Sequence, residues 1–125
     1  MNNAKNYVDY IVEQAKALIA IDSPSGYGGA VGEHLLKEFE ALGFSAYRTR
    51  KGGIIADLGG EDADDAVLLE AHCDTLGAMV HEIKADGRLK LTNIGGMQAN
   101  NAEAENVRII TKFNGVYEGT CQLAN

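Results

Sequence analysis

The chain has 125 residues, of which 46% are hydrophobic, and its 11 basic and 18 acidic residues give a formal net charge of −7. This length and apolar content suffice to bury a core and correspond to one domain, or to one domain with part of a second. The acidic balance argues against nucleic acid or an anionic membrane as a partner, because both repel negative charge.

The cysteines and the N-terminal segment bear on the compartment. Cys73 and Cys121 stand far apart, and neither has the CxxC spacing of a structural zinc site or a redox motif, so both are expected to be free thiols. No apolar run approaches the roughly 20 residues that span a bilayer, and the N-terminal segment is amphipathic, unlike a signal peptide. We therefore expect a protein of the reducing cytoplasm that does not enter a membrane.

Two amphipathic helices are predicted at the N-terminal end. Apolar residues recur at helical spacing over 4–21, and Pro24 ends the pattern because it lacks a backbone donor. A second pattern covers 31–42 and is closed by Gly43, which suits a left-handed cap. The glycines of 26–32 could hold a phosphate on free amides, but the dinucleotide fingerprint requires a preceding strand, and here a helix precedes. We interpret them as turn residues.

Three β-hairpins are predicted after the helices. They pair 44–50 with 54–58, 76–84 with 88–94, and 106–113 with 116–123, across the turns Lys51-Gly52-Gly53, Asp86-Gly87 and Asn114-Gly115. The acidic segment 59–65 lacks the spacing of an EF-hand loop and is interpreted as a solvated turn. Segment 97–105 has no periodicity and is predicted to be a loop.

The most informative stretch is 66–77, A-V-L-L-E-A-H-C-D-T-L-G. Its apolar run, 66–71, is typical of a strand covered on both faces, and such strands deliver functional side chains from their carboxyl ends. His72 would lie at that end, two residues before Asp74. A neutral imidazole can bind zinc or a similar divalent ion while a carboxylate fixes the ring. By spacing alone, an ordinary histidine and an ordinary turn aspartate are the commoner interpretation, because H-x-D is a frequent pattern.

The character of the chain changes near Thr75. Helices packed on a sheet are predicted before it and antiparallel strands without a helix after it, which indicates a boundary between two architectures. The last predicted strand leads directly into residues 123–125, and no further strand covers the edges of the second part.

Five segments carry a family resemblance: S-P-S-G (23–26), G-G-I-I-A-D-L-G-G (52–60), L-L-E-A-H-C-D-T-L-G-A-M-V (68–80), D-G-R-L-K-L-T-N-I-G-G (86–96) and N-G-V-Y-E-G-T (114–120). In this order they resemble the N-terminal portion of the glutamyl and tetrahedral aminopeptidases, cytoplasmic dinuclear metallo-enzymes of which some have been labelled endoglucanases. The resemblance implies an α/β fold, with helices on a central mixed sheet, followed by the start of an inserted antiparallel, barrel-like β-domain. It places the catalytic part in 1–75 and the insertion, used for dimerisation, in 76–125.

The resemblance also implies a site. His72 corresponds to the first metal ligand, and Asp74 to the catalytic-site carboxylate that orients it. The implied cofactors are two divalent metal ions, zinc, cobalt or manganese, and the implied partners are peptide substrates and further copies of the chain, from dimer to dodecamer. The family's other ligands and its general base come later in the chain and have no counterpart here. His34 and His81 match no family ligand and are interpreted as structural.

The sequence therefore predicts the N-terminal part of a cytoplasmic metallo-aminopeptidase, ended inside the insertion and inactive by itself. One alternative is a non-catalytic oligomerisation or interaction module, because the strands after residue 75 present open edges. Its contact residues would be Leu76, Met79, Ile83, Leu89 and Leu91. Another is a related zinc exopeptidase, but the hairpin that starts directly after Asp74 fits the family with the inserted barrel better.

Overall fold

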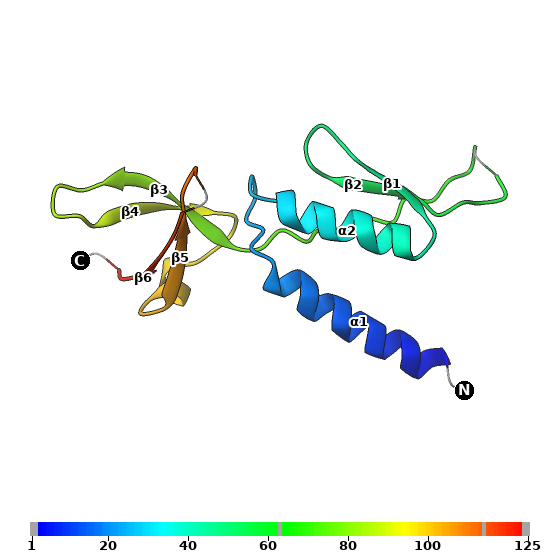
Figure 1. Cartoon of the computed structure of the whole chain (residues 1–125), viewed down its shortest axis with the longest axis horizontal. Coiled ribbons are helices and arrows are strands. Elements are labelled where there is room, and N and C mark those ends of the chain that lie inside the picture. The colour runs from blue at the N-terminus through cyan, green and yellow to red at the C-terminus, as the bar shows by residue number, and fades with distance from the viewer. Residues whose placement is uncertain (1–2, 63, 114, 124–125) are drawn as a thin grey trace. The chain divides into compact units, whose positions relative to one another are not determined.

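The computed structural model describes residues 3–62, 64–113 and 115–123. The chain divides into two compact units, Met1–Leu76 and Gly77–Asn125. Of the described residues, those of the first unit form two α-helices and one hairpin, and those of the second form two hairpins and a short 3₁₀-helix (Figure 1). The chain is thus a mixture of helices and small antiparallel sheets. None of the described helices is both long enough and apolar enough to cross a membrane.

Both predicted helices are confirmed. Helix α1 covers Asn3–Ala20 and helix α2 covers Gly29–Ala41. Gly43 ends the second helix with a φ of 86°, which a residue with a Cβ adopts only under strain. Its amide donates to the Glu40 carbonyl at 2.9 Å, and the Phe44 amide donates to the Phe39 carbonyl at 2.9 Å. This pair of bonds is the Schellman motif, which satisfies carbonyls that the helix end leaves free.

A row of polar side chains joins the two helices. The Gln14 amide donates to the Glu38 carboxylate at 2.8 Å, and the Gln14 carbonyl oxygen lies 3.2 Å from His34 Nε2. Because a carboxylate only accepts, the orientation of the Gln14 amide is fixed, and His34 Nε2 must be the donor. His34 therefore lies in a contact between helices.

The first hairpin packs against α2. Strands β1, Ser45–Arg48, and β2, Ile54–Asp57, pair antiparallel as predicted. The Arg48 guanidinium crosses the helix at Gly32 and donates to the Gly29 carbonyl at 2.9 Å and to the Glu33 carboxylate at 3.0 Å. A Cβ at Gly32 would lie 2.6 Å from Arg48 Nη2, so glycine at this position makes room for the arginine.

In the described residues, neither the predicted strand 66–72 nor the central mixed sheet is formed. The described strands make three two-stranded antiparallel sheets, and residues 66–74 belong to none of them. Val67, Leu68 and Leu69 are 84%, 82% and 81% exposed. A strand covered on both faces needs neighbours for its backbone N–H and C=O groups. The apolar run was interpreted as buried, but no described strand pairs with it.

The described core is small. Val31 is its buried hydrophobic residue, at 4% exposure, and Ser23 is fully buried. The accessible surface of the chain is 10707 Å². A compact monomer of 13.3 kDa exposes about 6,500 Å², and two separate compact units of that total mass about 7,700 Å². The chain thus exposes surface that compact domains ordinarily cover.

Two further hairpins form the second unit, as predicted. Strand β3, Gly77–Ile83, pairs with β4, Leu89–Ile94, and strand β5, Asn106–Ile110, pairs with β6, Val116–Thr120. The register of the first pair shifts between Val80 and Glu82, and His81 lies at this shift. Among the described residues these remain two separate two-stranded sheets, without the continuous ladder of a closed barrel. Asn114 of the third predicted turn and the last two residues lie outside the described part.

The prediction of a loop over 97–105 is wrong for four residues. Ala99–Ala102 form the 3₁₀-helix η1, with the Asn101 amide donating to the Gln98 carbonyl at 3.0 Å. A single turn of this kind needs only local bonds and shows no apolar period. After it, Ala104 and Glu105 stand opposite Cys121 in a β-bulge, and Ala104 takes a φ of 63°.

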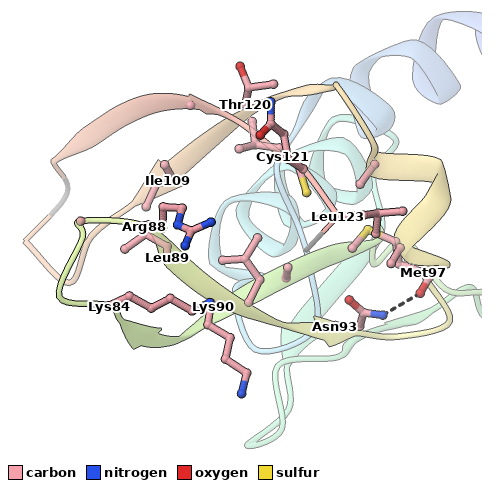
Figure 2. A pocket seen from close by; sticks show the side chains of 18 residues that line it. Lys84, Arg88, Leu89, Lys90, Asn93, Met97, Ile109, Thr120, Cys121 and Leu123 are labelled. Atoms are coloured by element: carbon pink, nitrogen blue, oxygen red, sulfur yellow. Dashed lines mark hydrogen bonds between the residues drawn. The ribbon is translucent and has the colours of Figure 1, made fainter. Parts of the chain in front are cut away.

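Figure 2 shows a pocket in the second unit, about 520 Å³ in volume, lined by residues of both hairpins. Leu89, Leu91 and Ile109 give it an apolar lining, and Lys84 and Arg88 lie among its lining residues. Three of the apolar residues named from the sequence lie outside this lining and are well exposed: Leu76, Met79 and Ile83, at 60%, 58% and 74%.

Candidate metal site

The loop after α1 holds residues 73–75 in place. Pro24 and Thr75 form a parallel bridge, in which the Thr75 amide donates to the Ser23 carbonyl at 3.0 Å. The Ser23 amide donates to Thr75 Oγ1 at 3.3 Å, and the Ser23 hydroxyl donates to the Cys73 carbonyl at 3.0 Å. Ser23 is fully buried with these bonds made. The two segments are thus tied together by backbone and hydroxyl groups on both sides of Asp74.

The Asp74 carboxylate uses one oxygen for each of two partners. Its Oδ2 accepts from the Ser25 hydroxyl at 2.6 Å, and its Oδ1 lies 2.9 Å from His72 Nδ1. An ionised carboxylate can only accept, so His72 Nδ1 carries a proton. In the neutral ring the free lone pair is therefore on Nε2.

The pair is exposed to solvent. The His72 side chain is 87% exposed and that of Asp74 50%. The hydrogen bond from Ser25, and after it the one from His72, holds the pKa of the Asp74 carboxyl below its usual value of 3.8, against a weak opposing effect of desolvation. Asp74 is consequently ionised at neutral pH, as an acceptor for His72 must be.

This donor set fits one corner of a metal site. Histidine ligands usually donate their second ring N–H to a carboxylate, which fixes the tautomer and the ring, and His72 and Asp74 have this arrangement. Nowhere among the described residues, this pair included, do three His, Cys, Asp or Glu side chains gather as a metal-binding set. A catalytic zinc takes three protein ligands. Among the described residues, His72 and Asp74 therefore fall short of a complete zinc site.

The structure adds Ser25, to which the sequence analysis assigned no role, to the pair of His72 and Asp74. Ser25 belongs to the S-P-S-G segment, which carried the resemblance but no function, and it lies 49 residues before its partner Asp74. The other two histidines belong to other elements: His34 contacts Gln14 in the helix pair, and His81 belongs to strand β3 of the second unit.

Residues 52–125, more than half of the chain, match the family model for the M42 glutamyl aminopeptidases. The chain belongs to this family. The resemblance inferred from the sequence motifs is thereby confirmed. As a member of the M42 family the chain is a peptidase homologue, which agrees with the predicted class of hydrolase.

Three curated relatives of the M42 chain have names of the same kind. It is 46% identical over 112 residues to "Putative aminopeptidase YhfE" of Bacillus subtilis, covering 87% of this chain and 32% of that protein. It is 31% identical over 87 residues to glutamyl aminopeptidase of Lactococcus lactis, covering 69% and 24%. It is 30% identical over 87 residues to "Putative aminopeptidase SgcX" of Escherichia coli, covering 69% and 23%. The chain thus spans a third or less of the length of these relatives.

A solved structure shares the fold. It is described as PhTET1-12s, a dodecamer in the asymmetric unit, and it matches with a TM-score of 0.75 and 24% sequence identity. The match covers 87% of this M42 chain and 32% of that one. At this identity the likeness concerns the fold alone.

Proposed function

We propose that this chain supplies the first metal ligand of a cytoplasmic metallo-aminopeptidase that releases N-terminal amino acids from peptides. The observation that carries the proposal is the bond between His72 Nδ1 and Asp74 Oδ1 at 2.9 Å, which leaves Nε2 of an exposed ring free to bind a metal ion. Membership of the M42 family supports the peptidase class and favours this proposal over the related zinc exopeptidases.

The roles of the residues follow from their bonds. His72 would hold a divalent ion, zinc, cobalt or manganese, through Nε2, and Asp74 would keep the ring in the tautomer that binds metal. When bound, a pair of such ions would polarise the scissile carbonyl and lower the pKa of a bound water towards neutrality. Asp74 accepts a hydrogen bond from His72 Nδ1, so its contribution to catalysis would be to orient the ring.

The other metal ligands and the general base of such an enzyme are not among the described residues. One imidazole and one outer carboxylate fall short of the three protein ligands of a catalytic zinc. We therefore propose that the 125-residue chain binds zinc weakly and hydrolyses no peptide by itself. In a protein of the length of its relatives, the exposed segment Val67–Leu69 would be the buried strand that its composition predicts, because burying each such side chain contributes about 1.5 to 3 kcal/mol.

The second unit is proposed to be part of a barrel-like insertion used in assembly. Its two hairpins present unpaired edges, and the solved relative in fold is a dodecamer. We propose that the intact protein forms a homo-oligomer, from dimer to dodecamer, and that residues 1–75 belong to its catalytic domain.

A chimera tests the proposed activity. Residues 1–125 would replace the matching segment of the Bacillus subtilis relative, and release of nitroaniline from a panel of aminoacyl nitroanilides would be measured with and without a chelator. We expect chelator-sensitive release by the chimera and none by the 125-residue chain. His72→Ala should abolish it and Cys73→Ala, one residue along, should not. Full activity of the His72→Ala chimera would contradict the proposal.

One observation favours a second candidate, a non-catalytic interaction module. Leu76, Met79 and Ile83 are exposed and could pair with another chain. Sedimentation of the 125-residue chain discriminates the two. A stable oligomer of defined size favours the module, whereas heterogeneous aggregates favour a segment that completes its fold in a longer protein.

A further inference from the structure

We propose that Ser25 is a positioning residue for the metal-binding histidine, acting through Asp74. The inference rests on the proposed metal-ligand role of His72. It concerns a different residue, in a loop 49 residues earlier than Asp74. It assigns to the second serine of the S-P-S-G segment the task of fixing which nitrogen of His72 is available.

The two oxygens of the Asp74 carboxylate have different partners. Ser25 Oγ donates to Asp74 Oδ2 at 2.6 Å, so this oxygen is occupied and the other, Oδ1, is turned to His72 Nδ1 at 2.9 Å. The Asp74 side chain is 50% exposed. Without the hydroxyl, a half-exposed carboxylate can rotate and replace its hydrogen bond from the His72 ring with one from water. Within the described part of the chain, the His72 ring, 87% exposed, has no other side-chain hydrogen-bond partner.

The second step separates positioning from structural support. The backbone around Asp74 is already attached through Ser23, whose amide, carbonyl and hydroxyl bond to Thr75 and to the Cys73 carbonyl. Removing the Ser25 hydroxyl leaves these bonds intact. The change therefore frees the carboxylate of Asp74 without detaching the segment that carries it.

Threonine and valine at position 25 form a matched pair for the test, because they have the same shape and differ in the hydroxyl. The 125-residue chain, free of metal, would be labelled with nitrogen-15, and the ring nitrogens of His72 would report which one carries the proton. We expect Ser25→Thr to keep the Nδ1–H tautomer and Ser25→Val to shift His72 towards Nε2–H. Amide signals of Cys73 and Thr75 should stay in place in both, whereas Ser23→Ala should move them.

A zinc titration of the same variants gives the second readout. Loss of the hydrogen-bond partner of a ligating histidine weakens metal binding by about 10 to 100-fold. Ser25 is one hydrogen bond further from the metal than that partner. We therefore expect zinc to bind His72 about 3 to 10-fold more weakly in the valine variant than in the threonine variant. Equal tautomer populations in the two variants would overturn the inference. Because the tautomer is read without metal or peptide, an inactive chimera would refute the proposed activity and leave this result standing.

Discussion

Gly32→Ala should fail to stabilise the chain, although alanine normally strengthens a helix. A Cβ at position 32 would lie 2.6 Å from Arg48 Nη2 and 3.0 Å from Arg48 Cζ, closer than non-bonded atoms approach. The guanidinium must move aside. It then loses its bonds to the Gly29 carbonyl, at 2.9 Å, and to the Glu33 carboxylate, at 3.0 Å.

The stability gained by placing alanine in the helix and the stability lost with the two Arg48 bonds nearly cancel. Alanine in place of glycine inside a helix stabilises by about 1 kcal/mol. The bond from the guanidinium to Gly29 contributes about 1 kcal/mol, and the ion pair to Glu33, whose side chain is 64% exposed, at most about 0.5 kcal/mol. In the native background the change in unfolding free energy should therefore stay within about 0.5 kcal/mol of zero. In an Arg48→Ala background the same substitution should stabilise by the full 1 kcal/mol or so.

Urea unfolding of the four proteins, followed by helical circular dichroism, measures the coupling, which we expect at about 1 to 1.5 kcal/mol. Gly29→Ala is the control, because a Cβ there meets nothing within 4 Å. It should change stability by the same amount with and without the Arg48 side chain. An equal gain from Gly32→Ala in both backgrounds would show that the arginine does not cross the helix at this glycine.

Three further outcomes are expected. Asp74→Asn should weaken zinc binding at His72 by about 10 to 100-fold, measured by the ring signals during a titration, because a neutral amide no longer requires a proton on Nδ1; unchanged affinity would contradict this. Ala104→Gly should stabilise the chain by about 0.5 to 1 kcal/mol in urea unfolding, since it relieves a φ of 63°, and a loss of stability would refute the strain argument. The pKa of Asp86, lowered by its hydrogen bonds from Arg88, should rise towards 3.8 in Arg88→Gln. The stabilisation from this pair is present above pH 3.8 and lost as pH falls through the lowered value, so a carbon-13 carboxyl titration that finds no rise would contradict it.

Local chemistry made the helices and hairpins predictable. Gly43 and Gly87 take φ values of 86° and 83°. Gly43 ends helix α2, and Gly87 lies in the turn between strands β3 and β4. In such cases a residue and its immediate neighbours contain the whole cause. The helix end at Gly43 needs only the carbonyls of its own last turn.

Long-range pairing explains what the sequence did not predict. The apolar run at Val67–Leu69 indicates burial, but whether it forms a strand depends on neighbours, and the described residues provide none. The bond between Ser25 and Asp74 joins residues 49 apart, which no spacing rule reaches. The H-x-D pattern, by contrast, spans two residues, and its predicted contact between His72 and Asp74 is present at 2.9 Å.

Metal content of the chimera tests the proposed role of His72 most directly. The purified chimera would be analysed for bound metal per chain, beside its His72→Ala and His81→Ala variants. We expect two ions per chain in the parent and in His81→Ala, and one or fewer in His72→Ala. Two ions retained without the His72 imidazole would contradict its assignment as a ligand.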